Sequence, residues 1–181
     1  MQVIQAIDPT ETTGKAKNLL DSVKAKFGTV PNMMKTMVNA PAVLEGYLNF
    51  SSALNTGTLP AKVREQIALT VADANNCEYC LSAHTAIGKM VGLSQQEITS
   101  SRHAVADNLK TDAILKLAHL IVNNRGEVGE KEIEKARQVG VSSEEITEIV
   151  ANVALNIFTN YFNHIAQTEI DFPKVSLSAK A

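Results

Sequence analysis

The chain contains two cysteines, Cys77 and Cys80, and a histidine follows them at His84. In a helix, side chains three and four positions apart lie on one face, so the two thiols and the imidazole would be neighbours. The exposed backbone amides at a helix N-terminus carry partial positive charge and stabilise a thiolate there. The imidazole can accept or relay the proton of Cys80. We therefore interpret these residues as a thiol site, used for redox chemistry or for metal binding.

Glu65 is a further candidate for proton transfer. On a helix predicted over residues 61–74, it lies at the edge of the polar stripe rather than in its middle. A half-buried carboxylate at such an edge can orient an imidazole or accept its proton. The adjacent Arg64 allows another interpretation, in which Glu65 only neutralises the guanidinium.

Each of these residues also has a less reactive interpretation. Paired cysteines on an apolar helix face can be inert small hydrophobic residues. The thiols and His84 could instead supply three ligands of a structural zinc ion, with Glu65 or another histidine as the fourth, although the sequence has no second C-x-x-C and no H-x(3–5)-H. The other histidines, His103, His119 and His164, are given no functional role.

The composition limits the class of protein. Of the 181 residues, 45% are hydrophobic and 20% are charged, which is typical of a globular protein. A net charge of −2 without a Lys/Arg-rich run argues against a nucleic-acid partner. No apolar stretch reaches the roughly 18 residues of a membrane span, and no signal-peptide pattern is present, so we expect a cytoplasmic protein. One domain is expected over residues 1–173, followed by a flexible tail over residues 174–181.

The hydrophobic pattern has a helical period along nearly the whole chain, which predicts an all-α, single-domain helical bundle. Ser94 with Glu97, and Ser142 with Glu145, have the Ser-x-x-Glu spacing of capping boxes at helix starts. The helix carrying the thiols is expected to be amphipathic. Its polar side chains opposite the thiols are Glu78, Ser82, Thr85 and Lys89. The predicted helices span residues 11–27, 32–38, 42–54, 61–74, 77–91, 107–123, 130–139 and 143–168.

The segment over residues 32–50 carries more apolar side chains than a single core-facing stripe uses. Such an excess indicates a subunit interface. Two short helices buried within the monomer would explain it equally well.

The spacing of the four candidate residues, E-x(11)-C-x-x-C-x(3)-H, resembles the signature of alkylhydroperoxidase-D-like (AhpD-like) proteins in the carboxymuconolactone decarboxylase superfamily. The C-terminal stretch is similar to members called peroxidase-related. The resemblance covers most of the chain between residues 30 and 173. It extends over the flanks of the signature, from residues 59–65 through residues 92–94, and it includes the C-terminal stretch over residues 156–173.

The resemblance implies a thiol-dependent hydroperoxide reductase with an all-helical fold that forms homo-oligomers, commonly trimers or hexamers. It assigns Cys80 as the thiolate that attacks the peroxide and becomes a sulfenic acid, which then condenses with Cys77 to a disulfide. His84 and Glu65 would form the proton relay. A dihydrolipoamide- or thioredoxin-like dithiol would donate the electrons. No cofactor and no metal are predicted.

One position departs from the family pattern, because Tyr79 stands where active members often have a histidine between the cysteines. On a helical wheel Tyr79 points away from the thiol face, so the thiols need not be affected. Three alternatives to the peroxidase stay open: a general disulfide reductase, a redox-sensing or zinc-holding helical module, and a lactone decarboxylase.

Overall fold

The computed structural model describes residues 2–177, and this part of the chain is helical with no strand. The all-α prediction is confirmed. No helix in the same residues is both long enough and apolar enough to cross a bilayer. The helices are α1 (Gly14–Phe27), α2 (Asn32–Met37), α3 (Pro41–Leu54), α4 (Ala61–Ala74), α5 (Glu78–Met90), α6 (Gln95–Arg102), α7 (Leu109–Asn123), α8 (Glu130–Gln138) and α9 (Ser143–Ala166).

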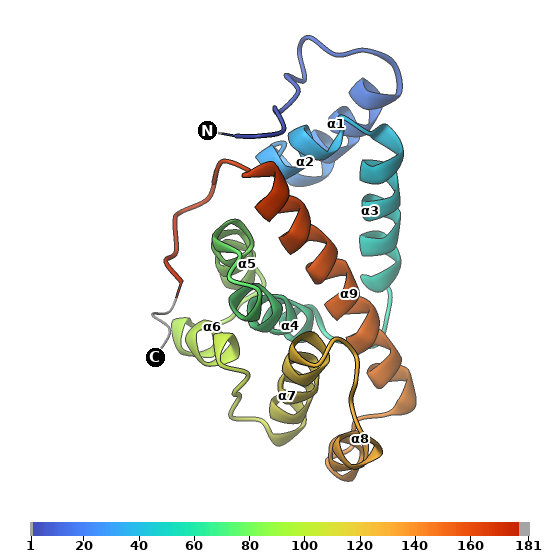
Figure 1. The fold of residues 1–181 in the computed structure, drawn as a ribbon, viewed down its shortest axis with the longest axis vertical. Coiled ribbons are helices and arrows are strands. Elements are labelled where there is room, and N and C mark those ends of the chain that lie inside the picture. The colour runs from blue at the N-terminus through green and yellow to red at the C-terminus, as the bar shows by residue number, and fades with distance from the viewer. Residues whose placement is uncertain (1, 178–181) are drawn as a thin grey trace.

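Helices α4 and α9 organise the molecule. α9 runs diagonally through it, with α3 along one side and α4 and α5 on the other (Figure 1). α4 packs against α5, α6, α7 and α9, so it is the helix that joins the two halves of the fold. Its central turns are buried on nearly all sides, which is expected of a helix surrounded by others.

The apolar core has two parts that meet along α4. One part lies between α4, α7, α8 and α9 and includes Ile67, Leu115 and Ile149. The other is formed by α1, α2, α3 and α5, and both cysteines belong to it. The thiol pair is therefore built into the hydrophobic core, not placed at its edge.

Four helix starts, those of α1, α3, α5 and α7, differ from the sequence prediction by one to three residues, and local contacts explain two of them. α1 begins at Gly14 rather than Glu11, because Thr13 is extended and the Glu11 amide closes a turn onto the Asp8 carbonyl at 3.2 Å. α5 begins at Glu78, because Cys77 is its N-cap and holds the Cys80 amide with its sulfur. Both predicted capping boxes are present, at the starts of α6 and α9.

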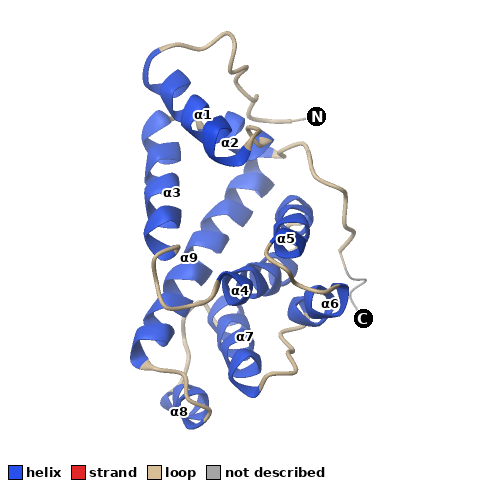
Figure 2. Ribbon diagram, turned by 180° about the vertical axis from the view of Figure 1, so that it is seen from behind, coloured by secondary structure: helices blue, strands red, loops and turns tan. Residues whose placement is uncertain are grey.

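The segment that follows α9 turns back and runs along α5 towards α6 (Figure 2). The Val175 amide donates to Ser82 Oγ at 3.0 Å, and Lys174 Nζ lies 3.4 Å from Glu78 Oε2. Ser82 is consequently buried, and Thr85 is buried too, although the amphipathic pattern placed both on the polar side of the helix. Of the predicted flexible tail, residues 178–181 lie outside the described residues.

The apolar segment over residues 32–50 has some side chains in the core and others on the surface. Its methionines, Met33, Met34 and Met37, are buried within the monomer. Val43 and Phe50 on α3 remain exposed. Burial within the monomer therefore explains the methionines, and a subunit interface at the exposed residues stays a prediction.

Shortening a core side chain of α4 next to the cysteines measures how much the packing of this helix contributes to the free energy of unfolding. Leu69 on α4 is 0% exposed and packs in the same cluster as the cysteines. We expect Leu69→Ala to lower the free energy of unfolding by about 2–5 kcal/mol, because it removes buried methyl groups and leaves a cavity. Urea denaturation followed by circular dichroism measures the change. As a control, Leu109→Ala on α7, where the leucine is 75% exposed, should change it by less than about 0.5 kcal/mol.

Candidate active site

The first turn of α5 places the two sulfur atoms in contact. The N-cap position of Cys77 directs its sulfur back over the helix start, where it accepts from the Cys80 amide at 3.3 Å. The Cys77 thiol also donates to Cys80 Sγ, with 2.6 Å between the sulfur atoms. Each cysteine is 2% exposed. The C-x-x-C thus forms a buried dithiol in which Cys77 is the donor and Cys80 the acceptor.

The packing of α4 against α5 brings Glu65 to His84. Glu65 Oε2 lies 2.8 Å from His84 Nδ1, and both side chains are half-buried. Arg64 points elsewhere: its guanidinium donates to the Leu59 carbonyl and, at 3.2 Å, to Asn55 Oδ1. Glu65 therefore partners the imidazole and not the neighbouring arginine.

The surroundings of Cys80 favour its thiolate. Burial opposes ionisation, but the hydrogen bond from Cys77, the positive charge of His84 and nearby side-chain amides outweigh it and lower the pKa of Cys80. For Cys77, the hydrogen bond that it donates to Cys80 is the largest cause, and with burial it raises the pKa of this thiol. The two thiols therefore differ in pKa, so that Cys80 loses its proton more readily and Cys77 keeps its own.

The pKa of His84 is raised, because the carboxylate of Glu65 outweighs the burial that would lower it. The Cys80 thiolate acts in the same direction. A positively charged imidazolium near a cysteine stabilises the thiolate over the protonated thiol. Glu65 therefore contacts His84, and His84 lies within electrostatic reach of Cys80, while the proton relay through these residues stays a prediction.

Two asparagines on α9 complete the surroundings of the sulfur, and sequence reasoning did not select them. Asn163 Nδ2 donates to Cys80 Sγ at 3.2 Å. Asn160 is 0% exposed; its Oδ1 accepts from Asn75 Nδ2 at 2.9 Å, while its own Nδ2 has no hydrogen-bond partner among the described residues and favours the Cys80 thiolate.

A sequence signal for these asparagines does exist. Asparagine recurs at positions 152, 156, 160 and 163, which is the spacing of one face of a helix, and all four side chains are buried. A polar stripe on the buried face of an otherwise apolar helix needs partners. In this chain, the C-terminal end of that stripe faces the dithiol.

The Tyr79 hydroxyl has its hydrogen-bond partners on α2 and on the segment after α9, not at the sulfur atoms. Its hydroxyl donates to Asp171 Oδ1 at 2.9 Å and accepts from the Met33 amide at 3.1 Å. Its ring meets Phe172 edge to face, with centroids 5.7 Å apart. Tyr79 therefore ties α5 to α2 and to the segment after α9, and takes no part in the dithiol.

Tyr47 on α3 is a second residue that sequence reasoning left among the core side chains. Burial, together with the negative charges of Glu65 and Cys80, raises the pKa of Tyr47 to about 12. The phenol therefore keeps its proton throughout the physiological range. It is a neutral hydroxyl in the electrostatic reach of the thiolate.

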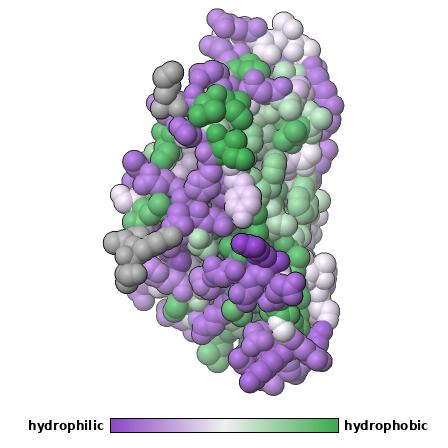
Figure 3. Space-filling model, in the orientation of Figure 1, coloured by the Kyte–Doolittle hydropathy of each residue, from purple (hydrophilic) through white to green (hydrophobic). Residues whose placement is uncertain are grey.

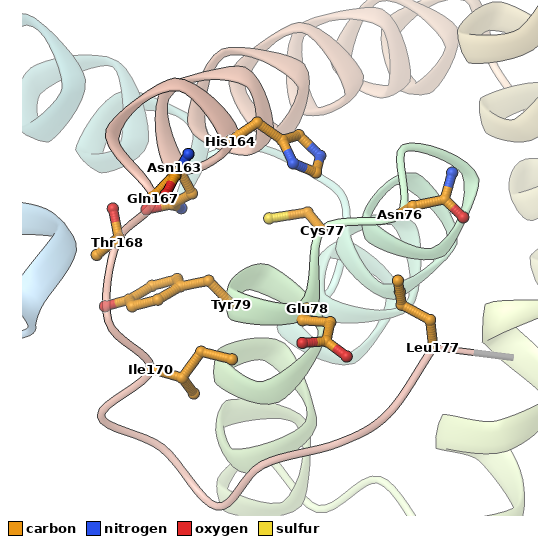
Figure 4. Close-up of a pocket in the computed structure, with 10 residues that line it drawn as sticks. All are labelled: Asn76, Cys77, Glu78, Tyr79, Asn163, His164, Gln167, Thr168, Ile170 and Leu177. Carbon is orange, nitrogen blue, oxygen red and sulfur yellow. The ribbon is translucent and has the colours of Figure 1, made fainter. Parts of the chain in front are cut away.

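A cavity of about 360 Å³ opens on the Cys77 side of the dithiol (Figure 4). Cys77 lines it, whereas Cys80 does not. The imidazole of His164, on α9, faces the Cys77 sulfur in this cavity. The remaining lining residues are Asn76, Glu78, Tyr79, Asn163, Gln167, Thr168, Ile170 and Leu177.

The other two histidines lie away from the dithiol. His103 is the exposed C-cap of α6, and His119 on α7 accepts from Asn123 Nδ2 at 2.7 Å. Within residues 2–177, no group of three or more His, Cys, Asp or Glu side chains is arranged to hold a metal ion.

The model of the carboxymuconolactone decarboxylase family matches residues 41–109, a segment that contains Glu65, both cysteines and His84. No curated protein matches the sequence significantly.

Solved structures match over nearly the whole chain. One is the AhpD core of a peroxidase-related protein from Ralstonia eutropha JMP134, with 23% identity, a TM-score of 0.83, and 92% of this chain and 90% of that one covered. Another is a peroxidase-related protein from Silicibacter sp. TM1040, with 22% identity, a TM-score of 0.79 and coverage of 93% and 92%.

A third structure is a variant of the debrominase Bmp8 in complex with 2,3,4-tribromopyrrole, with 16% identity, a TM-score of 0.80 and coverage of 94% and 92%. At these identities the structural likeness concerns the fold, and the fold carries more than one activity. Residues 41–109 of this chain therefore match the carboxymuconolactone decarboxylase family, and the chain has the all-helical fold of the AhpD core structure.

Proposed function

We propose that this protein is a thiol-dependent hydroperoxide reductase that cycles Cys77 and Cys80 between dithiol and disulfide. The observation that carries the proposal is the difference between the two buried thiols. Several donors lower the pKa of Cys80, while the Cys77 sulfur lies 2.6 Å from the Cys80 sulfur and retains its proton. A nucleophilic thiolate next to a thiol that can resolve it is what peroxide reduction through a disulfide requires.

In the first step the Cys80 proton passes to His84, whose imidazolium is stabilised by Glu65. The thiolate then attacks one peroxide oxygen and the O–O bond breaks. The attacked oxygen stays on sulfur as a sulfenic acid, and the other leaves as an alcohol after taking the proton from His84. Asn160 Nδ2, which has no partner among the described residues, can donate to the oxygen on sulfur.

In the second step Cys77 attacks the sulfur of the sulfenic acid. An S–S bond forms, the S–O bond breaks, and the oxygen leaves as water with the Cys77 proton. The disulfide must then be reduced by two electrons from outside. A dihydrolipoamide- or thioredoxin-like dithiol suits this step, and a cytoplasmic location would keep the donor reduced. The working unit would be the domain over residues 1–173.

We further propose that the protein acts as a homo-oligomer, a trimer or hexamer by its resemblance. The face on which α3 and α9 lie side by side is rich in apolar side chains (Figure 3). The α9 residues Tyr161 and Ile165 are 56% and 70% exposed. Exposed apolar surface of this kind is characteristic of contacts between subunits.

The three alternatives make different demands on the cysteines. A disulfide reductase would react with small disulfides but not with cumene hydroperoxide. A zinc-holding module would contain stoichiometric zinc by elemental analysis and show no turnover with a dithiol reductant. A lactone decarboxylase would keep its activity after both thiols are alkylated.

Single cysteine variants separate the two roles. We expect Cys80→Ser to reduce peroxide consumption to the background rate, because the attacking sulfur is gone. Cys77→Ser should consume one equivalent of cumene hydroperoxide and stop, since the sulfenic acid has no resolving thiol. Intact mass after dimedone labelling reads out the sulfenic acid. Near wild-type turnover in Cys80→Ser would show that the nucleophile is assigned wrongly.

The pH dependence of thiol alkylation tests the charge on Cys80. Its pKa is lowered, so the thiolate fraction, and with it the rate with iodoacetamide, should rise with pH and level off below the value of about 8.5 typical of a free thiol. We expect Asn163→Leu to slow alkylation about tenfold near neutral pH, because a hydrogen bond to a charged sulfur is lost.

The matched control is Asn156→Leu on the same face of α9. Asn156 Nδ2 donates at 2.8 Å to the Asn152 carbonyl within the helix, so its removal should leave the alkylation profile unchanged. Equal profiles for wild type and Asn163→Leu would mean that the amide does not hold the thiolate.

The oligomer can be measured directly. Light scattering after size exclusion should give a mass of at least three subunits for the wild type. Ile165→Asp should lower it, because a carboxylate would be buried at the contact. Val139→Asp, at an exposed position next to α8, should not. A monomeric wild type would contradict the proposal.

A further inference from the structure

Met33, the second residue of α2, shares a hydrogen-bond donor with Cys80. Asn163 Nδ2 lies 3.3 Å from Met33 Sδ and 3.2 Å from Cys80 Sγ. A side-chain amide has two N–H groups, so Asn163 can donate one to each sulfur. A thioether sulfur therefore lies beside the dithiol, on the other hydrogen of the same amide.

Two contacts hold Met33 in this position. Its backbone amide donates to the Tyr79 hydroxyl at 3.1 Å, and its sulfur accepts from Asn163. Met33 is 7% exposed, whereas Cys80 is 2% exposed. A hydroperoxide that reaches Cys80 is therefore also within reach of a methionine sulfur, which peroxides oxidise to the sulfoxide.

We propose that Met33 is a modification site, at which excess hydroperoxide forms methionine sulfoxide and thereby slows the reactions of Cys80. This inference rests on the proposed function, in which Cys80 is the attacking sulfur. The oxidant belongs to the same class of molecule as the proposed substrate. The modification would therefore lower the activity when hydroperoxide exceeds the supply of electrons for the disulfide.

The oxidation of Met33 needs no reactant besides the hydroperoxide. A lone pair of the sulfur attacks the terminal peroxide oxygen, an S–O bond forms and the O–O bond breaks. The proton of the attacked oxygen moves to the other oxygen, which leaves as an alcohol. The sulfur is oxidised by two electrons and the peroxide is reduced by two. Asn163 Nδ2 can donate a hydrogen bond to the oxygen that stays on Met33.

The hydrogen bonds of Asn163 explain how this oxygen would affect Cys80. Among the described residues, Asn163 Oδ1 is buried without a hydrogen-bond partner, so the two sulfur atoms alone orient the amide. A thioether is a weak acceptor, whereas a sulfoxide is polar. The sulfoxide oxygen would draw the amide towards Met33. Cys80 would then lose a donor that favours its thiolate.

Met34 offers a matched control on the same helix. It is 6% exposed, so it is as deeply buried as Met33. Within residues 2–177, no amide donates to its sulfur. Leucine has nearly the volume of methionine but no sulfur, and cores tolerate such a replacement best. Met33→Leu and Met34→Leu therefore differ in whether the sulfur beside Cys80 is removed.

The test starts from protein whose disulfide has been formed with diamide, because a disulfide protects both thiols from further oxidation. This protein is treated with excess cumene hydroperoxide, and the peroxide is removed. Dithiothreitol then reduces the disulfide but leaves a sulfoxide in place. Peptide mass should show one added oxygen on Met33 and less on Met34. The exposed Met90 is oxidised in all variants alike.

The rate of Cys80 alkylation by iodoacetamide near neutral pH measures the consequence. We expect treatment to slow it about tenfold in the wild type, because a hydrogen bond to a charged sulfur is lost. Met34→Leu should slow to the same extent. Met33→Leu should keep the rate of its untreated form.

The inference is overturned if Met33 gains no more oxygen than Met34, if treatment leaves the wild-type rate unchanged, or if Met33→Leu slows equally. Faster alkylation after treatment would also overturn it, because a sulfoxide that only loosened the core would expose Cys80. A failure of the proposed function looks different. Cumene hydroperoxide would then leave the thiols of the reduced wild type unchanged, while Met33 could still be analysed in the diamide-treated protein.

Discussion

The burial of an ionisable sulfur is the constraint on which the arrangement around the dithiol depends. Cys80 is 2% exposed, and a thiolate at such a place needs partners to replace water. Cys77, at the N-cap of α5, and His84, one turn after Cys80 on the same helix, supply two of these partners. Asn163 on α9 supplies a third. Glu65 on α4 acts one step further away, through His84. The packing of α4 and α9 against α5 therefore also brings together the charged and polar groups that set the pKa of Cys80.

Local patterns made most of the fold predictable from the sequence. Helical periodicity predicts every helix except α6, and the Ser-x-x-Glu spacing correctly marks the starts of α6 and α9. The spacing of Cys80 and His84 places them together because both lie on one helix. The pairing of Glu65 with His84 follows from the family pattern, and the structure gives its physical reason in the contact between α4 and α5.

What the sequence could not provide depends on contacts between distant segments. Asn163 meets Cys80 across a separation of 83 residues, and no local pattern encodes which buried amide will face the sulfur. The burial of Ser82 has the same origin, since the segment that covers it has no periodicity to analyse. A wheel drawn for a single helix identifies its faces but does not say what covers them.

The segment after α9 has a consequence for how such a protein can diversify. It contributes Ile170 and Leu177 to the cavity without belonging to any helix, and side-chain and backbone hydrogen bonds hold it in place. Substitutions there would reshape the entrance while leaving the helices that hold the sulfur atoms untouched. The cavity wall that this segment forms and the hydrogen-bond partners of Cys80 thus come from separate stretches of the chain, so substitutions can change one without changing the other.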